Sequence, residues 1–479
     1  MADSKGLTVK KNENFSEWFS EVVQKAELAD MRFNVKGFLV FQPNSVLVME
    51  KMYSLMELAL KKKGHRPYWF PTVIPEGNFK KESSHVAGFT PEVFWITHGG
   101  EKQLEEKLAL RPTSETAFYQ MFALWIRSYK DLPFKAYQRA QVFRYETKAT
   151  RPFLRSREFH WIETHCAFAN QEDAIKQVHE DMQTTKEVLH DRFGLPFIFF
   201  ERPLWDTFPG ATKTFAADVL NPDGRVVQQP STHMIKHDFA KAFDIKYKDR
   251  DGVDKHVYTT CYGPAISRIF ASVVIVHGDD KGLRFPWEIA PHHIAIVPID
   301  DSESLIAKAN ELKEKLHEYE VIVDTSDKSP GEKFNTWELR GVPVRIDIGH
   351  KEIENKKLSL FRRDINKKES ISEKDLLKHI EDIKVEFTSN LIKEADKIFN
   401  GRIVDARNID SVKKFIDLGN IVRCNFCSVS MEGKKCAEII KDKTGAEVRG
   451  TNLEMEKTEG KCVVCGKESM HTVYIARSY

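Results

Sequence analysis

Hydrophobic residues in the first half of the chain recur at helical spacing in two long stretches. One runs from Val46 to Ala59 before Gly64, and the other lies between Gln171 and Phe193 before Gly194. Apolar positions at this spacing, followed by glycine, predict two amphipathic helices. Shorter apolar pieces typical of strands are 68–71, 135–145, 159–168, 225–229 and 269–276. Because helices and strands do not alternate strictly, a mixed or antiparallel sheet flanked by helices is favoured.

The pattern changes at Ile294. Buried-strand segments alternate there with helical segments, in the order 294–299, 302–319, 321–323, 331–339 and 344–348. This alternation predicts a separate α/β domain with parallel strand pairing. A long charged helix is predicted from 372 to 399, and the cysteine-rich remainder is predicted to form a further unit.

The length of 479 residues predicts three domains, at roughly 100 to 200 residues each. We place them at 1–288, 289–399 and 400–479. Hydrophobic residues at 41% and charged residues at 30% are typical of a soluble globular protein. No apolar run approaches the roughly 20 residues that span a bilayer, and no hydrophobic signal opens the chain, so we predict no membrane insertion and a cytoplasmic location. The net charge of +2 neither favours nor excludes a nucleic-acid partner.

Five of the seven cysteines crowd the C-terminal end of the chain: Cys424, Cys427, Cys436, Cys462 and Cys465. In a cytosolic chain, paired CxxC spacing indicates metal binding before disulfide formation. Four thiolates satisfy the tetrahedral preference of a structural zinc site. Cys462 and Cys465 form one pair. By spacing alone, the other pair is either Cys424 with Cys427 or Cys427 with Cys436.

A strand that ends in Phe143-Arg144-Tyr145-Glu146 is followed by a basic loop with Lys148, Arg151 and Arg155. Residues two apart on a strand share a face, so Arg144 can hold a phosphate while Glu146 accepts from an adenine amino group. The alternative is an ordinary surface ion pair, which is common on strands.

A second segment, Thr260 to Arg268, places a glycine turn and one arginine before the apolar run 269–276. In this context the run also fits a helix through Ile269, Val273 and Val276, and Arg268 can clamp a polyphosphate with two parallel hydrogen bonds. The alternative is a core helix that begins with a solvent-exposed arginine.

Together these two segments resemble motifs 2 and 3 of class II aminoacyl-tRNA synthetases, and Pro71 resembles the motif 1 proline of their dimer interface. Segments 110–116, 206–211 and 277–283 make the chain similar to prolyl-tRNA synthetases of the archaeal and eukaryotic-like type. The resemblance implies an α+β class II catalytic domain with an antiparallel sheet flanked by helices. An α/β anticodon-binding domain and a small zinc-binding α+β C-terminal domain would follow.

The resemblance also implies roles for individual residues. Thr113 and Glu115 would accept the two hydrogens of the proline imino group, and Arg144 would neutralise the reacting carboxylate and phosphate. The pocket around the proline ring would comprise Trp161, Glu163, His165, Phe208 and His233. The ATP site would comprise Arg144, Glu146, Arg155, Gln228, Ser231 and Arg268. Trp161 and Phe208 also fit plain core positions, and His165 fits a hydrogen-bonded interior histidine.

The second domain resembles the anticodon-binding domain of class IIa synthetases through residues 330–343. Its candidate anticodon contacts are Lys333, Glu338, Arg340 and Arg345, with further basic positions at Arg362 and Arg363. Such residues are also often merely solvated. In the third domain the resemblance favours Cys427, Cys436, Cys462 and Cys465 as zinc ligands, and it implies that the final residue, Tyr479, folds back toward the active site.

The implied activity is ATP-dependent formation of prolyl-adenylate and transfer of proline to tRNA(Pro), with Mg²⁺, a structural zinc ion and a homodimer. Gly263 follows Glu163 at a separation of only 100 positions, so we expect no inserted editing domain and therefore misactivation of alanine. Alternatives are a class IIa synthetase for another amino acid, such as threonine or glycine, and a catalytically silent RNA-binding paralogue.

Overall fold

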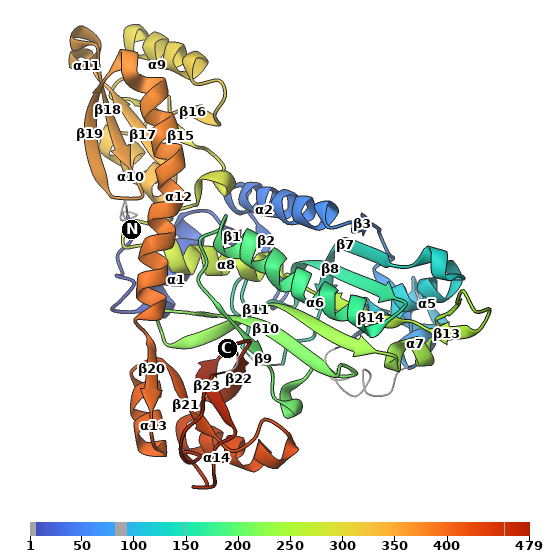
Figure 1. Cartoon of the computed structure of the whole chain (residues 1–479). Coiled ribbons are helices and arrows are strands. Elements are labelled where there is room, and N and C mark those ends of the chain that lie inside the picture. Colours follow the sequence, from blue (N-terminus) through green and yellow to red (C-terminus); the bar gives the residue numbers. More distant parts are fainter. Residues whose placement is uncertain (1–5, 82–92, 148, 455) are drawn as a thin grey trace.

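A large sheet organises the molecule (Figure 1). The structure is a computed structural model that describes residues 6–81, 93–147, 149–454 and 456–479. Eleven strands lie in the order β20-β21-β23-β22-β9-β10-β11-β14-β8-β7-β3. The first 288 residues contribute to this sheet the strands β3 (Arg66–Pro67), β7 (Phe134–Phe143), β8 (Glu158–Phe168), β9 (Ile198–Glu201), β10 (Lys213–Leu220), β11 (Arg225–Lys236) and β14 (Tyr258–Tyr262). From β9 to β7 all neighbours pair antiparallel, which confirms the predicted sheet.

Helices of the first domain pack against the large sheet, the smaller sheets and one another. They are α1 (Phe15–Lys25), α2 (Pro43–Lys62), α3 (Glu76–Phe79), α5 (Glu115–Trp125), α6 (Gln171–Thr185), α7 (Asp238–Ala242) and α8 (Ile266–His277). Both predicted amphipathic helices are confirmed, as α2 and as α6, which continues in a π-helical turn to His190. Smaller sheets pair β1 (Ala29–Asp30) with β2 (Val40–Phe41), β12 (Lys246–Lys248) with β13 (Asp254–His256), and β6 (Lys102–Leu110) with β4 (Val73–Pro75) and β5 (Phe94–Gly99).

Two short segments differ from the strand predictions. The run 269–276 lies in α8, so its strand interpretation is wrong and its helix interpretation is confirmed. This helix is buried on almost every side within the main hydrophobic core, and a helix buried all round loses the polar face that would have marked it. The piece 68–71 lies just beyond β3, which ends at Pro67.

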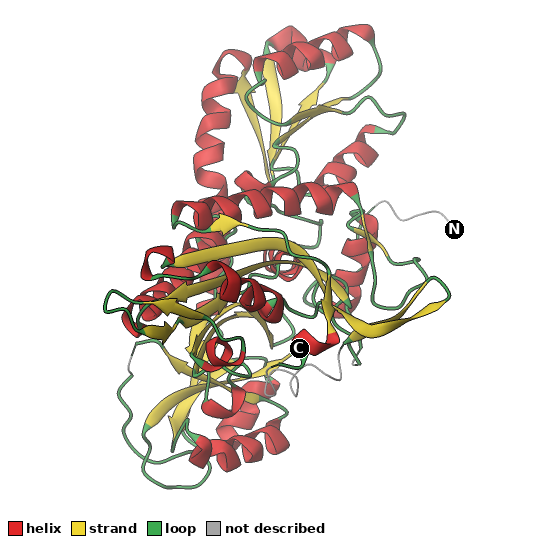
Figure 2. Ribbon diagram, turned by 90° about the vertical axis from the view of Figure 1, so that its right-hand side faces the viewer, coloured by secondary structure: helices red, strands yellow, loops and turns green. Residues whose placement is uncertain are grey.

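The second domain has the predicted parallel pairing. Strand β15 (Ile294–Pro298) pairs parallel with β16 (Val321–Val323) and with β17 (Val344–Ile348). Strand β18 (Lys357–Arg362) pairs antiparallel with β17, and β19 (Lys367–Ser372) pairs antiparallel with β18. Its helices are α9 (Glu303–Lys315), α10 (Pro330–Arg340) and α11 (His350–Asn355). The predicted charged helix is α12 (Leu376–Asn400), which runs from this domain along the first domain to the third (Figures 1 and 2).

The third domain shares the large sheet with the first. Its elements are β20 (Ile403–Ala406), α13 (Ile409–Asp417), β21 (Ile421–Phe426), α14 (Lys434–Thr444), β22 (Glu447–Asn452) and β23 (His471–Ser478). Strand β22 pairs antiparallel with β9, and the end of β23 pairs parallel with the start of β11. The predicted boundary after residue 399 lies at the end of α12, but the sheet passes across it. We retain the three-domain division as a proposal.

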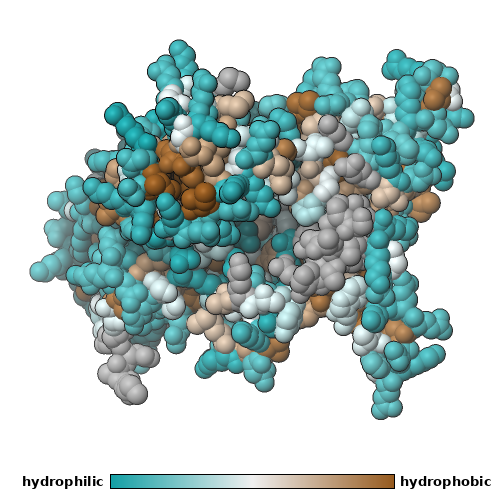
Figure 3. All heavy atoms as spheres, turned by 90° about the horizontal axis from the view of Figure 1, so that it is seen from below, coloured by the Kyte–Doolittle hydropathy of each residue, from teal (hydrophilic) through white to brown (hydrophobic). Residues whose placement is uncertain are grey.

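None of the helices in residues 6–81, 93–147, 149–454 and 456–479 is long and apolar enough to cross a bilayer. The face seen from below is mostly hydrophilic, with hydrophobic side chains in separate patches (Figure 3).

A buried ion cluster lies where the first and third domains meet. Asp218 on β10 is fully buried, and it accepts from Arg202 Nη2 at 2.7 Å and from Arg449 Nε, on β22, at 2.7 Å. Burial alone raises the pKa of Asp218, but the two guanidinium groups outweigh burial and hold its pKa below the ordinary value. Arg202 also donates to the backbone oxygen of Arg449 at 2.8 Å. The cluster therefore joins the two halves of the large sheet.

We expect Asp218→Asn to lower the free energy of unfolding by about 3 kcal/mol or more, because two buried guanidinium groups would lose their counter-ion. Urea denaturation measures the change. The pKa of Asp218 is lower in the folded state than in the unfolded state. The ionised carboxylate therefore makes its full contribution to the free energy of unfolding above the unfolded-state pKa. That contribution is lost as the pH falls through the folded-state pKa. Asp405→Asn is the control, because the Asp405 side chain is 66% exposed and pairs with Arg423 at the surface. It should lower the free energy of unfolding by less than about 1 kcal/mol. Equal effects of the two variants would contradict the assignment.

Candidate active site

A pocket of about 290 Å³ opens on one face of the large sheet. Its walls come from β8, β11 and β14, from the start of α5 and from the turn before α8. Side chains alternate along a strand, so Ser231 and His233 face the pocket while Thr232 between them donates to Asp181 of α6 behind the sheet. The predicted site residues that line the pocket are Thr113, Glu115, Arg144, Trp161, Glu163, His165, Phe208, Gln228, Ser231, His233 and Arg268.

One end of the pocket is acidic. Glu163 is 3% exposed and accepts from the Ser114 backbone N–H and from the Ser114 hydroxyl, both at 2.9 Å. Burial alone would raise the pKa of Glu163, but hydrogen bonds from His165 and Ser114 and the charge of Arg111 outweigh it, so the net pKa is lowered. Thr113 donates to the second carboxylate, Glu115. This end of the pocket is therefore built to receive a cation.

A neutral histidine forms one side wall. His233 is contacted by the Thr214 hydroxyl at Nδ1 (3.0 Å) and by the Ser231 hydroxyl at Nε2 (2.9 Å), and Phe208 packs on its ring with centroids 4.6 Å apart. Burial, together with the charge of Arg202, lowers the pKa of His233 to about 3. The imidazole is therefore uncharged at neutral pH and presents an apolar face to the pocket.

Two arginines form the opposite, basic end. Arg144 donates from Nε to the Pro112 carbonyl at 3.1 Å, and its guanidinium lies 5.0 Å from the Trp161 ring. Arg268 donates to the carbonyls of Leu154 (3.3 Å) and Gln228 (3.2 Å). Burial, with repulsion from Arg144 and Arg155, lowers the pKa of Arg268 to about 10. The Arg268 guanidinium therefore stays charged at neutral pH.

Trp161 also lines the pocket, and Gly263 makes room for it. A Cβ on Gly263 would lie 2.6 Å from Trp161 Nε1. Glycine is required here because the indole packs directly against the backbone.

Glu146 and Arg155 lie beside the pocket rather than in its lining. Arg155 Nε is 3.4 Å from the Glu146 carboxylate, and Arg155 Nη2 donates to the backbone oxygen of Tyr479 at 2.8 Å. The Tyr479 hydroxyl donates to Asp223 at 2.5 Å. The C-terminal tyrosine thus reaches the motif 2 loop, as predicted. Lys148 of that loop lies outside the described residues.

Two lining residues lie outside every segment singled out from the sequence, Arg202 and Thr214. Arg202 donates to Gln228 Oε1 at 3.2 Å, and the Thr214 hydroxyl contacts His233 Nδ1 at 3.0 Å. These partners are brought together by the sheet, so no local pattern marked the two residues. Gln229, another lining residue, donates to Ser272 of α8 at 2.7 Å.

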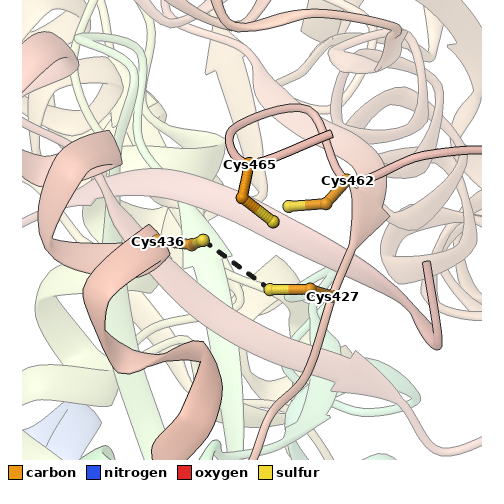
Figure 4. A group of neighbouring side chains, drawn as sticks. All are labelled: Cys427, Cys436, Cys462 and Cys465. Carbon is orange, nitrogen blue, oxygen red and sulfur yellow. Dashed lines mark hydrogen bonds between the residues drawn. The ribbon is translucent and has the colours of Figure 1, made fainter. Parts of the chain in front are cut away.

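The four cysteines favoured by the resemblance come together in the third domain (Figure 4). The sulfur atoms of Cys427, Cys436, Cys462 and Cys465 all lie within 4.8 Å of one another, and those of Cys427 and Cys436 are 3.7 Å apart. At Zn–S distances of about 2.3 Å, the corners of a tetrahedron are separated by about 3.8 Å. Four thiols at this spacing fit a zinc ion without further ligands.

Cys424, the fifth cysteine of this region, lies apart from that group. It is 4% exposed on β21 and packs in the hydrophobic core of the third domain. Burial raises the pKa of its thiol to about 12. The alternative in which Cys424 and Cys427 form the second pair is therefore not the arrangement in the structure.

The candidate anticodon residues are mostly buried and paired, not spread over an open face. Arg345 donates to Asp347 at 2.7 Å and to Glu338 at 2.6 Å. Lys333 is 6% exposed and donates to the Asp324 carbonyl at 3.2 Å. Arg340 pairs with Glu27 of the first domain. Carboxylates also enclose Arg362 and Arg363, since Asp364 lies 2.9 Å from Arg362 and Asp279 accepts from Arg363 at 2.7 Å.

The fold and the pocket define a class II aminoacyl-tRNA synthetase. Residues 94–277 match the family described as tRNA synthetase class II core domain (G, H, P, S and T). Residues 293–383 match the anticodon binding domain family, and residues 409–479 match the family described as prolyl-tRNA synthetase, C-terminal.

The relatives identify the particular family. The chain is 45% identical to the proline–tRNA ligase of Thermofilum pendens over 99% of both chains, and 41% identical to that of Methanopyrus kandleri over 97% of this chain and 96% of the relative. A solved structure of Giardia lamblia prolyl-tRNA synthetase in complex with prolyl-adenylate is similar at a TM-score of 0.94 and 36% identity, covering 99% of this chain and 100% of that one. The chain belongs to the prolyl-tRNA synthetase family.

We expect Cys465→Ser to lose the metal of the third domain, because a tetrahedral site with one thiolate missing holds zinc weakly. Cys424→Ser is the matched control and should keep one zinc ion per chain. Metal analysis after dialysis measures both. Zinc lost from the control but retained by Cys465→Ser would assign the site to the Cys424 pair.

Proposed function

We propose that this chain is a proline–tRNA ligase, which activates L-proline with ATP to prolyl-adenylate and then transfers proline to the 3′ end of tRNA(Pro). The observation that supports this most directly is one pocket with two buried carboxylates at one end and two arginines at the other. A substrate with a cationic amine and a reacting carboxylate fits between them, as does the phosphate chain of ATP at the basic end.

At the acidic end, the imino group of proline binds to Thr113 and Glu115. A secondary ammonium has two N–H donors, which one hydroxyl and one carboxylate can accept. Glu163 and His165 support this end, since they are hydrogen-bonded to each other at 3.4 Å. Trp161, Phe208 and His233 form the apolar walls around the ring, which an uncharged His233 suits.

At the basic end, Arg144 and Arg268 neutralise the charge that develops as the proline carboxylate attacks the α-phosphate of ATP. The catalytic effect is positioning and charge stabilisation, and no protein nucleophile takes part. Glu146 reads the adenine amino group, and Arg155, Gln228 and Ser231 contact ATP. A Mg²⁺ ion bound to the phosphates would supply further positive charge.

The two alternative functions are less well supported. A class IIa synthetase for another amino acid does not agree with relatives that are proline–tRNA ligases over nearly the full length of the chain. A catalytically silent RNA-binding paralogue would not require Arg144 and Arg268 to meet at one pocket with Thr113 and Glu115. Separate assays of pyrophosphate exchange with proline, threonine and glycine distinguish these functions.

The tRNA contacts and the assembly are part of the same proposal. The candidates for the anticodon contact stay Lys333, Glu338, Arg340 and Arg345, although the ion pairs and hydrogen bonds that they form in this structure would have to open.

We also propose a homodimer around the motif 1 segment, because Trp69 is 90% exposed beside Pro71, and Leu124 and Trp125 of α5 are 54% and 37% exposed. Exposed apolar side chains of this size suit an interface between two copies. A cytoplasmic location stays a prediction.

We expect Arg144→Ala to reduce proline-dependent exchange of pyrophosphate into ATP by about a hundredfold or more, because a charge-assisted contact in a site of this kind contributes about 3 kcal/mol. Arg139→Ala is the control. Arg139 lies on β7, which ends one residue before Arg144, but it pairs with Glu50 outside the pocket. The exchange rate of Arg139→Ala should therefore stay close to that of the wild type. Near-normal exchange in Arg144→Ala would refute the assigned role.

We also expect the enzyme to activate alanine and to leave alanyl-tRNA(Pro) uncorrected. The whole segment between Glu163 and Gly263 is used by α6, β9, β10, β11, β14 and the small elements between them, so it contains no separate editing domain. Alanine lacks two ring carbons of proline, and each missing methylene reduces binding by only roughly 1 to 3 kcal/mol. The measurements are alanine-dependent pyrophosphate exchange and deacylation of alanyl-tRNA(Pro) by the purified chain. Rapid deacylation would contradict the prediction.

A further inference from the structure

We propose that the acidic end of the pocket is also a binding site for a zinc-type divalent cation, formed by Glu115, His165 and Cys261, and that this cation competes with proline. The competition rests on the proposed function, since it assumes that the proline amine binds at the same end. The cation site itself does not.

The three side chains come from different elements and converge. Glu115 is the first residue of α5, and His165 on β8 is directly opposite Cys261 on β14 in the strand register. One ligand atom from each lies within 4.8 Å of the others. Carboxylate oxygen, imidazole nitrogen and thiolate sulfur are the ligand types that zinc prefers, and three protein ligands leave the fourth position open. The sheet thus holds a three-ligand set inside the pocket.

The surroundings of this set favour a cation. Glu115, His165 and Cys261 are 4%, 1% and 5% exposed, and a second carboxylate, Glu163, lies 3.4 Å from His165 Nε2. The other ring nitrogen of His165, Nδ1, is buried and has no hydrogen-bond partner within the described part of the chain. Buried polar atoms in a native structure are normally partnered, so an unpartnered ring nitrogen on a histidine that lines the pocket indicates that a ligand completes the site.

Binding replaces a proton with the metal. When the Cys261 sulfur bonds to the cation, the thiol proton leaves to solvent, and no oxidant or reductant is involved. The cysteine cluster of the third domain offers four sulfur ligands and should fill first. The pocket offers three and should fill at higher free zinc. Proline and the cation cannot bind together, because the imino group needs the same Glu115 carboxylate.

Zinc stoichiometry at buffered free zinc tests the site. We expect the wild-type chain to hold one equivalent tightly and to gain a second as free zinc rises, and we expect saturating L-proline to remove only the second. Cys261→Ala and the nearly isosteric Glu115→Gln should each hold the first equivalent alone, and its retention shows that the variant is folded. Cys166→Ala is the matched control, because Cys166 follows His165 on β8 but contacts His65 behind the sheet at 3.5 Å. It should keep both equivalents.

A second equivalent that persists in both Cys261→Ala and Glu115→Gln, or that never forms in the wild type, would overturn the inference. In a parallel assay, zinc should inhibit proline-dependent pyrophosphate exchange in proportion to its occupancy, and the inhibitory concentration should rise in proportion to the concentration of proline. Non-competitive inhibition would also overturn it. If the second equivalent forms but the chain shows no proline-dependent exchange, the proposed function fails and the metal site stands.

Discussion

The buried carboxylate of Asp218 is the constraint on which the arrangement of the molecule depends most. It lies between Arg202 and Arg449, which come from the first and the third domain. Separating two guanidinium groups from water is costly unless a carboxylate compensates both of them. The first domain cannot hold Arg202 in place without Asp218, and the third domain cannot dock without giving Arg449 the same partner. One buried charge therefore fixes how β22 continues the sheet beyond β9.

This constraint extends to the chemistry. Arg202 also donates to Gln228, a residue of the proposed ATP site, and Gln228 is paired with Asp218 in the register of β10 and β11. Strand β23 of the third domain pairs with β11 and is followed by Tyr479, whose backbone oxygen accepts from Arg155. The cysteine cluster lies in the same small core as β21, α14 and β23. A zinc ion bound by these cysteines would therefore stabilise the domain that places Tyr479 beside the proposed ATP site.

Local signals explain which parts of the fold could be predicted. Helices α2 and α6 and the alternating elements from Ile294 could be predicted from the spacing of hydrophobic residues and from glycines at helix ends. These signals involve residues only a few positions apart in the chain. Helix α8 is apolar on almost all sides, so the spacing of its hydrophobic residues could not distinguish a helix from a strand. Arg202, Asp218 and Arg449 escaped notice because the last two are 231 residues apart. Lys333 and Arg345 look like RNA contacts in the sequence, but their hydrogen-bond partners exist only in the folded chain.

The candidate site was predictable to the extent that its residues lie in contiguous motifs, and its charge separation was not. The acidic and basic groups of the lining are held by different neighbours. Glu115 accepts from Thr113 and Glu163 accepts from Ser114, while Arg144 donates to the Pro112 carbonyl and lies 5.0 Å from the Trp161 ring. Trp161 in turn packs so closely against Gly263 that a Cβ there would collide with the indole. Apart from Thr113 and Glu115, these partners are not close in the sequence, so no local motif predicts the contacts between them. The pocket that we propose for the proline amine therefore also presents carboxylates to a metal ion.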